Sequence, residues 1–240
     1  MRILFTLFLS LIFYACHKEN NRSREAEQIW NRITLVEQSD AQAKFARAKY
    51  ITTAAYSPLY IGTQADTVLA DHLFDFREYQ VDDWSNYSQP DSASLRIFVD
   101  TSQCISHADR VPPPPRVAKE DSLNVYEAPR YFAYPVYLIN QSTDTLDIGY
   151  GEYIPLILEA KDSTEAWRPI QRPRILCGTG LRYILLPPDN LVLTAYKLYK
   201  GKEQTKLRLR LGDEDKVYSN EFTGNINYSQ FIDKGYGDEE

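Results

Sequence analysis

The sequence predicts a mainly β protein, an antiparallel β-sandwich preceded by a short N-terminal helical segment. Beyond residue 57, short runs of β-branched, leucine and aromatic residues alternate with turn residues, which is typical of strands joined by short connections. The chain holds 18 tyrosines, and tyrosine suits a strand because one ring face packs while the hydroxyl stays in water. Little helical periodicity separates the runs, so the strands are expected to pair antiparallel.

The strands are expected where these runs are strongest. The segment Lys206–Leu211 alternates strictly between charged and apolar residues, which predicts that Leu207, Leu209 and Leu211 face a core while Arg208 and Arg210 lie in water. The candidate strands are 59–61, 67–70, 94–99, 132–140, 145–150, 154–160, 167–170, 181–186, 191–199, 205–211 and 216–222.

Residues 25–56 are predicted to be a helical lead-in to the strands. Ile29, Ile33 and Val36 recur at helix spacing. Ser39 and Asp40 then indicate a break and an N-cap for a second turn of helix. This segment is expected to cap one end of the sheet domain.

The proline-rich residues 106–129 interrupt the strand pattern. Pro112 to Pro115 favour a polyproline stretch without backbone donors. The stretch therefore predicts either an exposed loop or a linker between an N-terminal β unit, 57–105, and a C-terminal β-sandwich, 130–235. A docking segment for an aromatic groove is a further interpretation of the same prolines.

The first sixteen residues indicate export. Arg2 precedes a run of about a dozen apolar residues that ends at Ala15 and Cys16, and the run is too short for a permanent membrane span. The segment resembles a bacterial lipoprotein signal, which implies that 1–15 are removed, that Cys16 is acylated, and that the polar residues 16–24 form a flexible tether. An ordinary cleaved signal is the alternative. No Asp follows Cys16, and in lipoproteins this favours the outer membrane.

Two cysteines remain once Cys16 is assigned to lipid. Cys104 and Cys177 form an even pair in an oxidising compartment, which predicts a disulfide between them. Closing this loop of some seventy residues would stabilise the fold by roughly 4 kcal/mol in the chain-entropy model. The alternative, a reactive thiol, lacks a histidine well placed to activate it.

Charge and composition exclude several classes of function. The net charge is −6, and it becomes −7 when the signal takes Arg2 with it, so nucleic acid is not expected as a partner. No metal site is predicted, because Cys104 and His107 have a ligand-like spacing without a second pair. No cofactor motif is present.

One stretch invites an enzymatic interpretation. Asp100-Thr101-Ser102 follows apolar residues and resembles the catalytic stretch of aspartic proteases. Asp-Thr recurs at Asp66 and Asp144, each time beside a predicted strand, which indicates turns that Asp caps. The sequence therefore predicts a protein that is not an enzyme.

Aromatic residues of the predicted sandwich suggest a ligand site. Tyr150, Tyr153 and Trp167 are candidates for stacking on sugar rings, although packing within the sheets also explains them. Three nearby arginines could bind an anion or guard a sheet edge: Arg168, Arg172 and Arg174.

Residues 134–222 resemble the Ig-like sandwich modules of uncharacterised envelope lipoproteins. The resemblance is carried by the turn that follows Asn140, by Trp167–Ile170 and by the closing stretch Val217–Phe222. It implies a fold and a compartment but no activity. Together these observations predict a lipid-anchored envelope protein that binds a protein partner or supports an assembly, or alternatively a carbohydrate-binding module.

Overall fold

A computed structural model describes residues 33–37, 42–65, 67–71, 74–83, 85–108, 129–174 and 182–235. The chain divides into a small unit, Met1–Val36 with Ala65–Val68, and a large unit, Glu37–Gln64 with Leu69–Glu240. Strands β1 and β4 form a two-stranded sheet. The sites discussed below all belong to the large unit.

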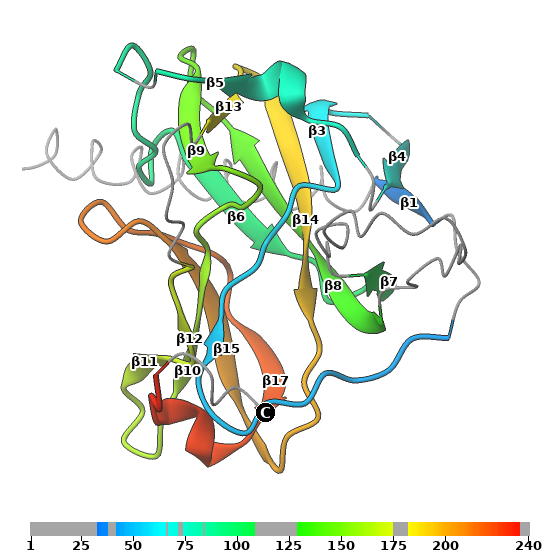
Figure 1. Ribbon diagram of the computed structural model, residues 1–240, viewed down its shortest axis with the longest axis vertical. Helices are drawn as coiled ribbons and strands as arrows, with labels where there is room; N and C mark the ends of the chain where they lie inside the picture. The colour runs from blue at the N-terminus through cyan, green and yellow to red at the C-terminus, as the bar shows by residue number, and fades with distance from the viewer. Residues whose placement is uncertain are drawn as a thin grey trace, which may run out of the picture. The chain divides into compact units, whose positions relative to one another are not determined.

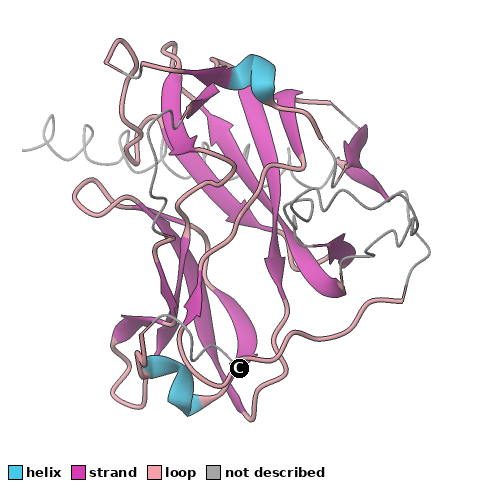
Figure 2. Ribbon diagram, viewed as in Figure 1, coloured by secondary structure: helices cyan, strands magenta, loops and turns pink. Residues whose placement is uncertain are grey.

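Strands dominate the described residues, and the prediction of a mainly β, sandwich-like chain with antiparallel sheets is confirmed (Figure 2). The described helices are the short 3-10 helices η1 (Arg77–Tyr79) and η2 (Tyr228–Phe231), and no helix in the described ranges is long and apolar enough to cross a membrane. The strands are β1 (Thr34–Glu37), β2 (Thr52–Thr53), β3 (Tyr60–Thr63), β4 (Thr67–Ala70), β5 (Gln80–Val81), β6 (Leu95–Val99), β7 (Ile105–Ala108), β8 (Arg130–Asn140), β9 (Leu146–Tyr150), β10 (Ile157–Lys161), β11 (Trp167–Pro169), β12 (Gln171–Arg172), β13 (Tyr183–Leu186), β14 (Asn190–Lys197), β15 (Glu203–Leu211), β16 (Val217–Tyr218) and β17 (Phe222–Ile226).

Two five-stranded sheets and one three-stranded sheet build most of the large unit (Figure 1). The first has the order β3-β14-β8-β6, with β7 also paired to β8. The second has the order β11-β10-β15-β16, with β17 also paired to β15. The third is β5-β13-β9, and β12 pairs with β2 in parallel. Because the first sheet contains strands from both sides of residues 106–129, that stretch does not separate two sheets.

The central strand β8 contains Pro135 at the point where its pairing partner on one side changes from β7 to β6. Residues 130–133 pair with β7 and residues 136–140 pair with β6. Pro135 lies at the change, where its carbonyl accepts the Asp100 N–H at 3.0 Å and its missing N–H interrupts neither ladder.

One apolar core extends across the sheets. Leu207, Leu209 and Leu211 of β15 are buried in it, as the alternation predicted, and they share the cluster with Leu138 of β8 and Ile184 of β13. The prediction for Arg208 and Arg210 is wrong: their side chains are only 19% and 12% exposed, because both fold onto Glu159 of the neighbouring strand.

The two larger sheets are joined at an edge by Asn220. Its side-chain carbonyl accepts the Val99 N–H at 2.8 Å and its amide donates to the Val99 carbonyl at 3.1 Å. Ser219 binds Leu209 of β15 through its backbone N–H, at 2.9 Å. The break between β16 and β17 therefore lets this segment satisfy the edge of β6, whose outer backbone groups would otherwise lack partners.

The predicted helical lead-in is wrong where the structure describes it. Residues 34–37 are strand β1, and residues 42–56 are extended, with bridges from Lys44 to Tyr131 and from Ala46 to Tyr199. Burial alternates along this segment, with Ala46 and Ala48 buried between exposed neighbours, which is the period of a strand. Residues 25–32 and 38–41 lie outside the described residues, as do the predicted signal, the tether and Cys16.

Candidate binding face

The outer surface of the second five-stranded sheet gathers charged and aromatic side chains. Residues that face each other across antiparallel strands share one side of a sheet. Glu159 lies opposite Arg208, Lys161 opposite Trp167, and Arg210 opposite Tyr218. We call these six residues the β10–β15 face: Glu159, Lys161, Trp167, Arg208, Arg210 and Tyr218.

Glu159 lies at the centre of the β10–β15 face. One of its carboxylate oxygens accepts from Nε and Nη2 of Arg208 at 2.8 Å, and the other accepts from Nε of Arg210 at 2.9 Å. Arg210 also pairs with Asp213 at 2.8 Å. Burial alone would lower the pKa of Arg210, but its hydrogen bonds and its attraction to Asp213 and Glu159 raise the pKa above its usual value.

A row of alternating cations and rings crosses the same face. The Arg208 guanidinium lies 4.3 Å from the centroid of the Trp167 ring and 3.9 Å from that of Tyr218. The Lys161 ammonium lies 5.4 Å from the Trp167 centroid. Tyr218 is 40% exposed, so its ring presents apolar area to solvent beside these charges.

The turn between β10 and β11 positions Trp167. One carboxylate oxygen of Asp162 accepts from the backbone N–H and hydroxyl of Thr164 and from the backbone N–H of Ala166, at 2.8, 2.6 and 3.2 Å. These bonds, led by the Thr164 hydroxyl, lower the pKa of Asp162 below its usual value. Glu165 takes the left-handed conformation with φ of 62°, which closes the turn.

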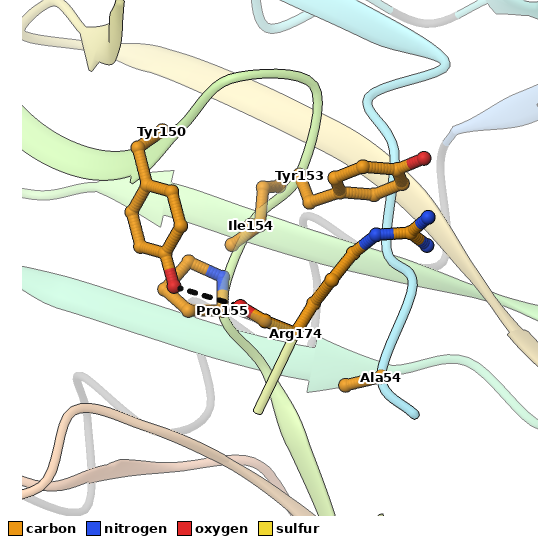
Figure 3. A pocket seen from close by; sticks show the side chains of 6 residues that line it. All are labelled: Ala54, Tyr150, Tyr153, Ile154, Pro155 and Arg174. Atoms are coloured by element: carbon orange, nitrogen blue, oxygen red, sulfur yellow. Dashed lines mark hydrogen bonds between the residues drawn. The ribbon is translucent and has the colours of Figure 1, made fainter. Parts of the chain in front are cut away.

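The three aromatic residues predicted to bind sugar do not form one site. Tyr150 and Tyr153 line a small pocket with Arg174, Ala54, Ile154 and Pro155, and Trp167 is not among these lining residues (Figure 3). The Arg174 guanidinium lies 4.3 Å from the Tyr153 centroid, and the Tyr150 hydroxyl donates to the Arg174 carbonyl at 3.5 Å. The pocket encloses about 10 Å³, which is room for about one water molecule.

The three candidate arginines have different partners. Arg168 pairs with Asp162 at 2.6 Å, and buried Arg172 pairs with Asp233 at 2.9 Å. Arg174 lies over the ring of Tyr153. Each cation is thus engaged by its own neighbour, and the structure does not support one anion site built from all three.

The two remaining sequence predictions have different outcomes. The buried Asp100 carboxylate accepts from the Ser102 N–H and hydroxyl and from the Gln103 amide at 2.8, 2.6 and 2.8 Å, which is the capped turn that the sequence indicated. Cys104 is exposed between β6 and β7, and Cys177 lies outside the described residues, so the disulfide remains a prediction.

Sequence reasoning missed Glu159 as the centre of the face. The signal available was a single carboxylate near the end of the apolar run Ile154–Ala160, because a carboxylate in a buried strand requires a cation. Its partners lie 49 and 51 residues further along the chain.

No family model, curated protein or solved structure matches the chain.

Proposed function

We propose that this chain is a lipid-anchored protein of the bacterial envelope whose β domain binds a partner protein through the β10–β15 face. The row formed by Lys161, Trp167, Arg208 and Tyr218 carries the proposal. Tryptophan, tyrosine and arginine dominate the energetics of protein interfaces, and the two aromatic residues bury large areas with little loss of side-chain freedom.

The arginines of the face are held in fixed positions. Arg208 and Arg210 share the carboxylate of Glu159, and Arg210 also pairs with Asp213, so these ion pairs are balanced in charge. Both guanidiniums are already held in place by these bonds and by the rings around Arg208. A partner that binds here therefore loses little free energy to ordering these side chains.

The remaining parts of the proposal come from the sequence. Acylation of Cys16 would hold the domain at a membrane, most consistently the outer membrane, and the domain would act by binding rather than by catalysis. Carbohydrate binding loses support, because Arg174 lies over the Tyr153 ring and Arg208 over the Trp167 ring, where a sugar would stack.

Site-specific photo-crosslinking in cells tests the binding face. A photoreactive amino acid replaces Tyr218 in the full chain, and Arg77, which is 79% exposed on η1, serves as the matched control position. We expect one discrete protein adduct from position 218 and a several-fold weaker adduct when Trp167→Ala is added, with an unchanged melting temperature as the folding control. Equal adducts from both positions, or none from position 218, would remove the proposed face.

Mass spectrometry of the chain purified from membranes tests the anchor separately. We expect a mature N-terminus at Cys16 that carries acyl chains, since several chains together anchor a protein stably where one does not. An unmodified N-terminus would refute the anchor and leave the binding face to be judged by crosslinking alone.

A further inference from the structure

A second surface of the large unit has an unusual charge. Residues 44–50 run as an extended segment whose backbone is fixed to neighbouring strands: the Ala46 N–H donates to the Leu198 carbonyl at 2.9 Å, and the Lys200 N–H donates to the Ala46 carbonyl at 2.8 Å. Because alternate residues point the same way, burial of Ala46 and Ala48 leaves Arg47 and Lys49 exposed.

Cations from other parts of the chain join this segment. Lys49 and Lys234 lie 5.3 and 5.1 Å from the centroid of the Tyr50 ring. Lys44 and Lys197 lie 5.6 and 5.3 Å from that of Tyr131. With the two lysines of the β14–β15 connection, these cations form what we call the basic stripe: Lys44, Arg47, Lys49, Lys197, Lys200, Lys202 and Lys234.

Few carboxylates accompany the basic stripe. In the described segments 42–50, 197–203 and 228–235 that carry it, the acidic residues are Glu203 and Asp233. Asp233 is already paired with Arg172 at 2.9 Å. These segments therefore carry seven cations and two carboxylates in a chain whose net charge is −6.

Exposed apolar side chains border the same cations. Among the described residues, five large hydrophobic side chains are exposed, and three of them lie here: Phe45 at 49%, Tyr228 at 48% and Ile232 at 50%. Residues 228–232 adjoin the segment directly, because the Ile51 N–H donates to the Ile232 carbonyl at 3.3 Å and the Ser229 hydroxyl donates to the Lys49 carbonyl.

We propose that the basic stripe docks on an anionic membrane surface, with its cations on lipid phosphates and Phe45, Tyr228 and Ile232 at the level of the headgroups. Lysines and arginines next to exposed aromatic and aliphatic side chains are the composition of interfacial membrane contacts. The inference rests on the proposed anchor at Cys16, because tethering to the bilayer gives a weak surface contact a high effective concentration.

Lysine footprinting of the acylated full chain in vesicles tests this docking. The vesicles contain either phosphatidylcholine alone or phosphatidylcholine with about one third phosphatidylglycerol. We expect labelling of Lys49, Lys200 and Lys234 to fall several-fold on the anionic vesicles only, and to recover at high salt, where exposed charges are screened. Lys216, exposed in the β15–β16 turn, is the internal control and should not change.

Charge reversal supplies the matched variants. The double variant Arg47→Glu/Lys49→Glu should restore labelling of Lys200 and Lys234, since each lost cation weakens anionic surface binding about fivefold. The control Lys206→Glu/Lys216→Glu should retain the protection, because these exposed lysines lie outside the stripe.

Three outcomes would overturn the docking. Unchanged labelling on anionic vesicles, while the protein remains anchored, removes the lipid contact but leaves the anchor. Equal protection with both vesicle types, or without vesicles, indicates that part of the chain covers the stripe. Protection that appears only when membrane proteins are added assigns the stripe to an acidic protein. Failure of the anchor is a separate result, read from the mass of Cys16.

Discussion

Replacing Glu159 with glutamine should destabilise the domain substantially although the change removes only a charge. The Glu159 side chain is 10% exposed and accepts all its described ion pairs from Arg208 and Arg210. In the Glu159→Gln variant the two guanidiniums would remain close together without the carboxylate between them. Breaking a buried pair by removing one partner typically costs about 3–5 kcal/mol.

Contacts that remain after the substitution should make the loss of stability smaller than this typical cost. Arg210 keeps Asp213, Arg208 keeps the rings of Trp167 and Tyr218, and the glutamine oxygen still accepts one hydrogen bond. We therefore expect a loss of about 2–3 kcal/mol in the free energy of unfolding. For a domain of this size that corresponds to a fall of about 4–12 °C in melting temperature.

Urea denaturation and thermal unfolding measure the effect, with Glu165→Gln as the matched control. Glu165 also pairs with a cation, Lys161 at 3.3 Å, but its side chain is 80% exposed, so its loss should cost less than about 0.5 kcal/mol. In a double-mutant cycle, Arg208→Leu should recover at least about 1 kcal/mol of the Glu159→Gln loss. A Glu159→Gln variant as stable as the Glu165→Gln control would refute the central role of this carboxylate.

Two other side chains give independent tests. Asn220→Ala should destabilise the domain by about 2 kcal/mol, because the buried backbone N–H and carbonyl of Val99 lose their partners. Asn220→Asp keeps the acceptor, so its stability in urea denaturation should fall between that of Asn220→Ala and that of the parent. Equal stability of all three chains would contradict this prediction. Burial raises the pKa of Asp147 above its usual value, although hydrogen bonds from Gln89 and Gly149 oppose the shift. The folded state then holds the Asp147 proton more tightly than the unfolded state, so the carboxylate costs stability as pH rises above about 4. The melting temperature of Asp147→Asn minus that of the parent should therefore be larger at about pH 7 than at about pH 4. A difference that does not depend on pH would rule the explanation out.

The sequence was most informative where a strand's neighbours do not matter. Strict alternation in β15 predicts the buried leucines, because period two alone decides which side chains share a face. The segment 44–50 was wrongly predicted to be helical because Ser39 and Asp40 indicated an N-cap before it. Its strand-like conformation depends on bonds to Leu198 and Arg130, which local composition does not encode.

The candidate site shows the same limit. Alternation correctly places Arg208 on the outer face, yet its environment depends on Glu159, Trp167 and Tyr218, which come from three other strands. A charged residue on an outer face was expected to lie in water. Only the register of β10 with β15 reveals that a carboxylate lies opposite it. Strand pairing, rather than strand location, is what the sequence alone could not supply.

Gln171 is the centre of a polar network inside the domain. Gln171 accepts from the Tyr56 hydroxyl at 2.8 Å and the Leu158 N–H at 3.1 Å, and its amide donates to the Tyr199 hydroxyl at 3.5 Å. This network links segments far apart in the chain, and its groups are used in holding them together. The two surfaces proposed to make external contacts, the β10–β15 face and the basic stripe, lie outside this network.

These two surfaces should respond differently to salt. On the β10–β15 face the cations are partly buried and fixed against Glu159 and aromatic rings, so a partner held there depends on shape and packing, which salt screens little. The cations of the basic stripe are mostly exposed, and its nearby carboxylates are few, so its contacts are long-ranged and weaken as ionic strength rises. Raising the salt concentration should thus release the stripe from an anionic surface, whereas photo-crosslinking from position 218 should still yield the protein adduct at high salt. Loss of both contacts over the same salt range would mean that the β10–β15 face also binds chiefly by charge.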